Sequence, residues 1–232
     1  ILQTKKANPS VVIAYDCRHN SRLFAEESAR VLATMGIKVL VFDKITPTPE
    51  LSFAVRELKA TGGIVITASH NPPNYNGYKI YDDFGCQLVP DLADIVIDEI
   101  AKAPDAFQID VESFASLKQK GYIEIVDDSI DTAYLNKVKS IRVHPDLNKE
   151  NFLVVFTPLH GTSSLLGQRL LQETGYPCIP VVEQMVADPN FSTVSSPNPE
   201  NKEAFDLAIT YAKKHHADIC IATDPDADRM GI

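Results

Sequence analysis

The sequence predicts two consecutive α/β domains, each with a mixed, mostly parallel sheet flanked by helices. First, short apolar runs rich in β-branched residues recur without polar alternation, which is typical of strands buried on both faces. Second, segments with apolar residues at helical spacing lie between these runs, as crossover connections require. Third, the alternation restarts at Phe152 after a polar segment, Arg142–Asn151. We therefore place the first domain at residues 1–145 and the second at residues 146–232.

The first domain is expected to begin with strand, helix, strand, helix and strand. Its expected strands are Ser10–Asp16, Lys38–Phe42, Ile64–Ile66 after a turn at Gly62-Gly63, Tyr78–Tyr81 and a short one near Ile123. Residues 104–127 otherwise have no clear period and are interpreted as an insertion.

Each expected helix of the first domain has an apolar stripe or a terminal signal. The first ends at Gly36 and should bury the stripe Phe24, Ser28, Val31, Leu32 and Met35. The second begins with Thr48 as N-cap and Pro49 as first residue, and buries Leu51, Ala54, Val55 and Leu58. The third spans Asp91–Ala103 with Leu92, Ile95, Val96 and Ile100 inward. The fourth is marked by Ile130, Tyr134, Val138 and Ile141.

The second domain repeats the alternation. Its expected strands are Phe152–Phe156, Cys178–Val182 and, as the final strand, Asp218–Thr223. Helices are expected at Leu165–Thr174 and Glu203–His216. The segment Asp188–Asn201 contains three prolines and is expected to be a long loop, a feature that is often functional.

Composition excludes several classes of protein. No apolar run reaches membrane-spanning length, and the first residues do not look like a signal peptide. The net charge of -9 argues against a nucleic-acid surface, although a metal ion or local basic residues can still attract an anionic substrate. The four cysteines are far apart, which favours a reducing, cytoplasmic setting over a zinc site or a disulfide framework.

The segment Gly62–Pro73 contains the first candidate site. Its apolar strand stops abruptly at Thr67-Ala68-Ser69-His70-Asn71-Pro72, and prolines cannot continue a central strand. Ser69 therefore lies on a constrained loop after a strand end, where open α/β sheets bind ligands. The alternative for this segment alone is a polar turn capped by Ser69 and Asn71.

A dinucleotide-binding site is the obvious alternative for a strand-helix-strand unit. Asp43 stands at the end of the second strand, where a ribose-binding acid would lie. The first strand-to-helix loop, however, has no glycines that would let the backbone approach a pyrophosphate. The sequence does not support this alternative.

The second candidate site is Asp224-Pro225-Asp226-Ala227-Asp228-Arg229, directly after the last expected strand. If this segment is extended, its three carboxylates share one side and converge. Carboxylates at such short separation repel each other unless a cation neutralises them. Because all the ligands would be oxygen atoms, the cation would be Mg²⁺ or Ca²⁺.

Three other interpretations of this acidic segment are weighed. A calcium-binding EF-hand loop also begins with alternating acids, but it needs glycine where Arg229 stands, and it follows a helix. A phosphatase of the haloacid-dehalogenase type has an Asp-x-Asp after a strand, with the first Asp, here Asp224, as nucleophile. A solvated acidic turn is the third.

Together these segments resemble the α-D-phosphohexomutase family, which comprises phosphoglucomutases and phosphomannomutases. The family has four domains, and this chain resembles the first two, so it is expected to be a fragment without mutase activity of its own. The segments that carry the resemblance are Tyr15–Arg18, Thr67–Pro72, Asn76–Lys79, Thr157–Gly161, Pro197–Glu200 and Asp224–Arg229.

The resemblance implies a reaction that interconverts hexose 1-phosphate and hexose 6-phosphate through a hexose bisphosphate. Ser69 would carry the phosphoryl group, and Mg²⁺ would bind the phosphorylated Ser69 together with Asp224, Asp226 and Asp228.

The resemblance also implies roles for the neighbouring side chains. Arg18 and Arg229 would stabilise charge on the moving phosphoryl group, and Lys79 would do the same or help to move the hydroxyl proton. His70 would orient the loop. A phosphomannomutase or phosphopentomutase, a metal-dependent phosphatase and a non-catalytic binding module remain as alternatives, and the sequence leaves the sugar and the oligomeric state open.

Overall fold

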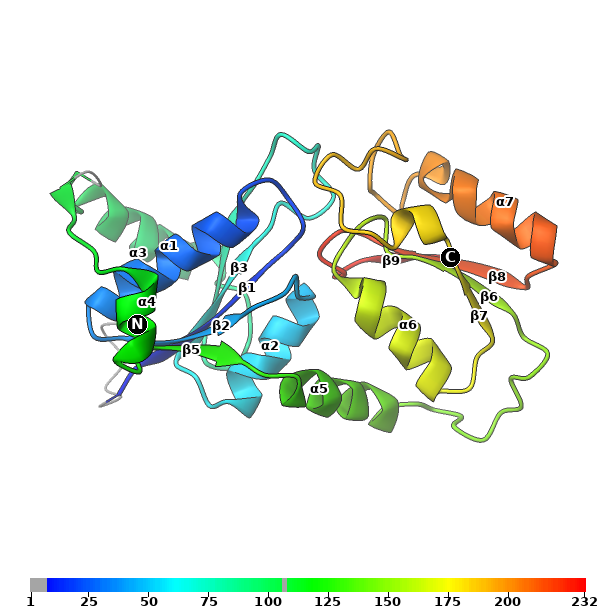
Figure 1. Ribbon diagram of the computed structural model, residues 1–232, viewed down its shortest axis with the longest axis horizontal. Coiled ribbons are helices and arrows are strands. Elements are labelled where there is room, and N and C mark those ends of the chain that lie inside the picture. The colour runs from blue at the N-terminus through cyan, green and yellow to red at the C-terminus, as the bar shows by residue number, and fades with distance from the viewer. Residues whose placement is uncertain (1–7, 106–107) are drawn as a thin grey trace.

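The computed structural model describes residues 8–105 and 108–232. Two α/β units lie side by side, the first running from blue to green and the second from yellow to red (Figure 1). The first unit contains β1 (Ser10–Tyr15), α1 (Ser21–Thr34), β2 (Lys38–Phe42), α2 (Thr48–Glu57), β3 (Gly62–Ile66), β4 (Tyr78–Tyr81), α3 (Pro90–Ala101), α4 (Phe114–Gln119), β5 (Ile123–Val126) and α5 (Ser129–Ser140). The second contains β6 (Val154–Thr157), α6 (Ser163–Glu173), β7 (Cys178–Pro180), the short 3-10 helices η2 (Val182–Gln184) and η3 (Lys202–Phe205), α7 (Asp206–His215), β8 (Ile219–Thr223) and β9 (Met230–Gly231).

The first sheet has the strand order β4-β3-β1-β2-β5, with only β4 antiparallel among the described strands. One face packs against α1 and α4, and the other packs against α2 and α5. The prediction of a mixed, mostly parallel sheet covered by helices on both faces is confirmed.

The interpretation of residues 104–127 as an insertion is wrong for the part that the structure describes. β5 adds to the sheet in parallel beside β2, with Val39 opposite Ile123. The helix α4, which the sequence did not predict, buries Leu117 in the same core as Ile123. These elements are short, so each contributes too few apolar residues to give a visible period.

The helix α1 forms where it was expected, but its most buried face is not the predicted stripe, of which Leu32 packs partly against the core. Its buried apolar residues are Ala25, Ala29 and Ala33, whereas Phe24 and Met35 are 44% and 61% exposed. Small side chains let the helix backbone approach the sheet closely, and this packing outweighs the greater hydrophobicity of the predicted stripe.

The helix α3 also forms, but its expected inward face does not pack against a core. Within the described residues, no α3 side chain is buried, and Leu92, Ile95 and Ile100 are exposed. A helical period therefore predicted the element correctly but not its partner.

The second sheet has the order β7-β6-β8-β9 and is parallel except for β9. α7 packs on one face through Ala208, while α6 covers the other, where Gly167 lies against the Phe156 ring. The expected final strand is β8, but β9 follows it and pairs along its edge. Among the described helices, none is long and apolar enough to cross a membrane.

The two units meet through loops at the carboxyl ends of their strands. The start of α2 and the loop after β3 contact the loop after β8, through hydrogen bonds that join Thr48 to Asp226 and Ser69 to Asp224. Because both sheets direct these loops to one place, residues more than 150 positions apart form a single site.

Candidate active site

The Ser69 loop leaves β3 in a strained, fixed conformation. Ser69 has a φ of +52°, in the left-handed region that costs a non-glycine residue roughly 1–2 kcal/mol. Its backbone N–H donates to Thr67 Oγ1 at 2.9 Å. Gly77 passes so close beneath the loop that an added Cβ would lie 2.5 Å from the Thr67 carbonyl oxygen. The loop is therefore held from below, as strained residues at functional sites commonly are.

Arg18 holds the same loop from the side. The four terminal N–H groups of its guanidinium donate to the carbonyl oxygens of Ser69 (2.6 Å), Asn71 (2.5 Å), Pro72 (2.8 Å) and Tyr75 (3.0 Å). Its Nε lies 3.2 Å from Asp16 Oδ2. Its four terminal donors are thus directed at backbone carbonyl oxygens, which differs from the expected contact with a moving phosphoryl group, while Nε forms an ion pair with Asp16 without a hydrogen bond.

The surroundings of Arg18 are buried and come from both units. Asp16 accepts hydrogen bonds from the Arg18 backbone N–H and from Ser21 Oγ, which fixes the carboxylate beside the guanidinium. The ring of Phe191, from the second unit, lies 5.0 Å from the Arg18 guanidinium. Burial lowers the pKa of Arg18 while Asp16 opposes that shift, so the guanidinium stays charged.

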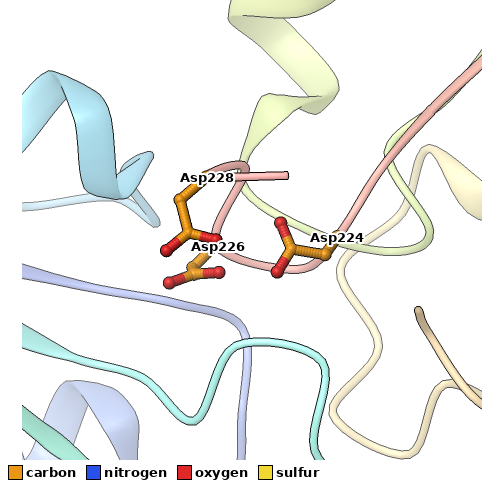
Figure 2. Close-up of side chains that lie close together, drawn as sticks. All are labelled: Asp224, Asp226 and Asp228. Atoms are coloured by element: carbon orange, nitrogen blue, oxygen red, sulfur yellow. The ribbon is translucent and has the colours of Figure 1, made fainter. Parts of the chain in front are cut away.

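The acidic segment after β8 forms a tight turn rather than the extended strand that was expected. Ala227 has a φ of +58°, and its N–H donates to the Asp224 carbonyl oxygen at 3.0 Å. The three carboxylates still converge, with one oxygen from each within 4.8 Å of the others (Figure 2). A turn, and not an extended strand with alternating side chains, therefore brings the three carboxylates together. Asp224 and Asp226 are buried, and Asp228 is at the solvent edge.

The acidic turn is braced by loops from both units. Thr48, at the start of α2, donates its hydroxyl to Asp226 Oδ2 at 2.8 Å and its backbone N–H to the Asp226 carbonyl oxygen at 2.8 Å. The expectation that Thr48 caps its own helix is wrong, because its hydroxyl donates to Asp226 and α2 has no side-chain cap hydrogen bond. Behind the turn, Gly161 lies so close to Pro225 that an added Cβ would be 2.4 Å from the Pro225 Cα atom.

Charge at the acidic turn is unevenly balanced. Burial and the neighbouring Asp226 raise the pKa of Asp224 to about 8. Burial also disfavours ionisation of Asp226, but the Lys79 ammonium and hydrogen bonds outweigh it and hold the pKa of Asp226 below its usual range. Lys79 Nζ lies 2.9 Å from Asp226 Oδ2 and 3.2 Å from Asp228 Oδ2. Two buried carboxylates with one ammonium leave room for further positive charge.

The donor set fits a hard divalent cation. Three carboxylates from one turn supply oxygen ligands, and Asp226 Oδ1 is buried without a hydrogen-bond partner among the described residues. Such ligands and such an orphaned oxygen are what a site for Mg²⁺ or Ca²⁺ requires.

Ser69 lies directly against the acidic turn. Its Oγ donates to Asp224 Oδ2 at 2.7 Å, and His70 Nδ1 lies 3.2 Å from the same Oγ. Burial, aided by the positive charge of Arg229, lowers the pKa of His70 and favours its neutral form. Arg229 donates its backbone N–H to Asp224 Oδ1, while its side chain reaches Glu200 and remains largely exposed.

The structure thus brings most predicted site residues together. Ser69, His70, Lys79 and the three aspartates form one cluster, Arg229 lies at its rim, and Arg18 lies behind the Ser69 loop. The sequence did not single out Thr48, Gly161, Asp16 or Phe191 as contributors. Only Gly161 and Asp16 lay in segments that carried a resemblance. Thr48 was hidden because a threonine before a proline is also an ordinary helix start.

Replacement of Thr48 by valine should loosen the acidic turn. Valine keeps the shape but removes a buried hydrogen bond to a charged acceptor, which contributes about 1.5–3 kcal/mol to stability. We expect the free energy of unfolding, measured by urea denaturation, to fall by that amount. Thr48→Ser, which keeps the hydroxyl, is the matched control and should stay near wild type. A Thr48→Val variant as stable as the Thr48→Ser variant would contradict this role.

Two family descriptions match nearly the whole chain. The description "Phosphoglucomutase/phosphomannomutase, alpha/beta/alpha domain I" matches residues 1–106, and "Phosphoglucomutase/phosphomannomutase, alpha/beta/alpha domain II" matches residues 132–232. Among curated relatives, the phosphoglucomutase of Staphylococcus aureus strain MRSA252 is 44% identical and that of strain N315 is 43% identical, each over all 232 residues. The chain spans 41% of the length of these relatives.

Solved structures show the same similarity in three dimensions. A putative phosphomannomutase from Thermus thermophilus superposes with a TM-score of 0.81 at 28% identity, covering 97% of this chain and 48% of that one. A phosphoglucomutase/phosphomannomutase family protein from Burkholderia thailandensis superposes with a TM-score of 0.75 at 25% identity, covering 97% of this chain and 46% of that one.

Proposed function

Because this chain belongs to the phosphoglucomutase/phosphomannomutase family, we propose that it supplies the phosphoryl-carrying serine and the metal loop of a phosphohexomutase. The reaction interconverts hexose 1-phosphate and hexose 6-phosphate through a hexose 1,6-bisphosphate. The observation that supports this most directly is the contact between Ser69 Oγ and Asp224 of the acidic turn, at 2.7 Å. It joins a candidate phosphoryl acceptor to a candidate metal site, although the two come from different domains.

In the proposed reaction, phosphorylated Ser69 donates its phosphoryl group to the free hydroxyl of the bound sugar phosphate. The P–O bond to Ser69 breaks, a P–O bond to the sugar forms, and the proton of the hydroxyl passes to a base. The bisphosphate then turns round and returns its other phosphoryl group to Ser69. Such transfers depend on positioning and on neutralised phosphate oxygens. The braced, strained Ser69 loop supplies the positioning.

The residues around Ser69 are assigned complementary roles. Lys79, already beside two carboxylates, balances negative charge at the turn, and neutral His70 lies within reach of Ser69 Oγ to accept or return a proton. Arg229, at the rim, is free to turn from Glu200 toward a phosphate. The role assigned to Arg18 is to hold the Ser69 loop in position, rather than to neutralise the charge of the phosphate.

We propose that Asp224, Asp226 and Asp228 hold Mg²⁺, together with an oxygen on Ser69. When bound, Mg²⁺ acts as a Lewis acid on the phosphoryl oxygens. The protein's own contribution is to fix the carboxylates through Thr48 and Lys79, so that little reorganisation is needed when the cation binds.

Replacement of Asp226 by asparagine should weaken Mg²⁺ binding by at least about tenfold, because the turn loses one of its anionic ligands. Isothermal calorimetry on this chain measures the affinity directly. Asp98→Asn, on the exposed helix α3, is the matched control and should bind Mg²⁺ as wild type does. Equal affinities of the Asp226→Asn and Asp98→Asn variants would exclude a metal site at this turn.

Ser69 is favoured over Asp224 as the residue that carries phosphate. Asp224 is fully buried, and both of its oxygens accept hydrogen bonds, from Ser69 Oγ and the Arg229 N–H. Ser69 is only partly buried. A phosphatase with Asp224 as nucleophile would need that carboxylate to leave both partners, so this alternative has less support.

The proposed substrate is a glucose phosphate. The similarity to relatives named phosphoglucomutase in Staphylococcus aureus, one of them 44% identical to this chain, supports glucose over a mannose or pentose phosphate. A coupled assay of the whole protein with glucose, mannose and ribose 1-phosphates tests this choice, and faster turnover of either of the latter two would change it. The four cysteines are all free, in keeping with the cytoplasmic setting that we propose.

A further inference from the structure

A second acidic site lies behind the metal loop, in a cavity between α2, α5 and the start of α6. The cavity has a volume of about 110 Å³. One wall comes from the first unit and includes Lys44, Glu50 and Asp131, and the opposite wall comes from Thr162 and Leu166 of the second. A space of this size is large enough for ordered water but not for a sugar phosphate.

The carboxyl groups of this cavity are buried and incompletely paired. Glu50, in the first turn of α2, is 1% exposed, and Asp131 of α5 is 2% exposed. Both oxygens of Glu50, Asp131 Oδ1 and Thr162 Oγ1 have no hydrogen-bond partner in the described part of the chain. A buried, unpaired carboxylate is strongly unfavourable, so these atoms require a proton, an ion or water.

The charges that face Glu50 come from three elements. The loop after β2 contributes Lys44, and α5 contributes Asp131 and the hydroxyl of Tyr134, while Asp128 of α5 contacts Lys44 from the solvent side. The start of α6 contributes the hydroxyls of Thr162 and Ser164 as its polar groups in the described lining, beside the apolar Leu165 and Leu166.

Lys44 Nζ is already committed to α5. It lies 2.6 Å from Asp131 Oδ2 and 2.5 Å from Asp128 Oδ1, and Asp128 is largely exposed. The two buried carboxyls and the partly buried Lys44 ammonium therefore lack one positive charge when both carboxyls are ionised. A metal ion would have to bind beside that ammonium, whereas one proton balances the charge without crowding it.

We propose that Glu50 and Asp131 bind one hydrogen ion between them at neutral pH, with Glu50 as a carboxylic acid that donates to Asp131 Oδ1. This arrangement gives partners to two of the orphaned atoms at once. Burial, reinforced by the negative charge of Asp131, raises the pKa of Glu50 to about 8, which agrees with the geometry. The site is thus a carboxyl–carboxylate pair that takes a proton where the metal loop takes a cation.

The pair is connected to the metal loop through both walls of its cavity. Glu50 is two residues from Thr48, which holds Asp226, and the Thr162 N–H donates to the Pro225 carbonyl oxygen at 2.8 Å. Loss of the proton would place a second negative charge between the domains at the point where they brace the acidic turn. The packing of the two domains should therefore weaken as Glu50 ionises.

The sign of the pH effect follows from the raised pKa. Between about pH 4.5, where an unfolded glutamate ionises, and about pH 8, the folded chain holds a proton that the unfolded chain has released. Stability from this group is therefore fully present below that window and is lost as the pH rises through it. The effect on the unfolding equilibrium constant is about tenfold per pH unit for one proton.

The test compares wild type with Glu50→Gln, which keeps the shape of the side chain and removes its ionisation. Urea denaturation of both should give a ratio of unfolding constants that changes about tenfold per pH unit between about pH 5 and 8. A ratio that does not change with pH would overturn the proposal. In addition, the Glu50 side-chain carboxyl carbon of the folded wild type, followed by NMR, should titrate near pH 8, and titration between about pH 4 and 5 would also overturn it.

A cation in the cavity is the competing explanation, and the same variants distinguish it. Salts of Na⁺, Mg²⁺ and Ca²⁺ are added in turn, and the stabilisation that each gives to wild type is compared with the stabilisation of Glu50→Gln and of Asp226→Asn. If the stabilisation by one salt disappears in Glu50→Gln but persists in Asp226→Asn, the cavity binds that cation rather than a proton, and the proposal is overturned. No readout depends on mutase activity, so the result stands independently of the proposed function.

Discussion

Replacement of Ser69 by alanine is expected to abolish phosphorylation of the protein by glucose 1,6-bisphosphate and to lower mutase turnover of the whole protein by about 10⁴-fold or more. Alanine removes the only atom at this position that can carry a phosphoryl group, and leaves the loop held by Arg18 and Gly77. Because the three aspartates and the contact of Asp226 with Thr48 remain, Mg²⁺ binding should be weakened by the loss of the Ser69 oxygen but not abolished. The measurement is phosphopeptide mapping after incubation with the bisphosphate, alongside the coupled assay.

The chemistry of the label separates the two candidate carriers. A phosphoserine is stable to hydroxylamine and is eliminated in alkali, whereas an acyl phosphate on Asp224 is cleaved by hydroxylamine. Ser195→Ala, in the exposed loop before η3, is the matched control and should be labelled as wild type is. Label that survives in Ser69→Ala and is released by hydroxylamine would contradict the mutase assignment and support the phosphatase alternative.

The fold was predictable where one short signal was sufficient. The strands β1, β2 and β3 are continuous apolar runs, so each run by itself predicts a strand that is buried on both faces. Faces of helices were less predictable, because they depend on the partner. The buried face of α1 is a row of alanines, because the helix lies close to the sheet and larger side chains do not fit there. The sequence of the helix alone does not predict that distance. The strand β5 depends for its place on pairing with β2, far earlier in the chain.

The site divides in the same way. Ser69 and the three aspartates were predictable because each lies in a local motif at a strand end. Their convergence was predicted for the wrong reason, since the turn at Ala227 and not an extended strand brings the aspartates together. Thr48 was interpreted as a helix cap because its true partner, Asp226, is 178 residues away. Arg18 was recognised as a site residue, but its role depends on which acceptors lie around it.

Replacement of Arg18 by methionine is expected to lower the free energy of unfolding by about 3–5 kcal/mol, because it leaves the buried Asp16 carboxylate without its ion-pair partner. It also removes the donors to the carbonyl oxygens of Ser69, Asn71, Pro72 and Tyr75, so the loop loses its fixed conformation. Urea denaturation measures the first effect, and phosphorylation of Ser69 reports the second. Arg22→Met is the matched control, since Arg22 forms an exposed ion pair with Glu26, worth about 1 kcal/mol at most.

Arg18→Lys separates charge from geometry. A lysine ammonium keeps a positive charge near Asp16, but it has three donors at one point and cannot span four carbonyl oxygens. We therefore expect Arg18→Lys to recover part of the lost stability while phosphorylation of Ser69 stays impaired. If Arg18 acted on the phosphate instead, Arg18→Met would reduce phosphorylation but unfold at the same urea concentration as Arg22→Met. That outcome would mean that Arg18 contacts the moving phosphoryl group, as the sequence predicted, and does not serve to hold the loop.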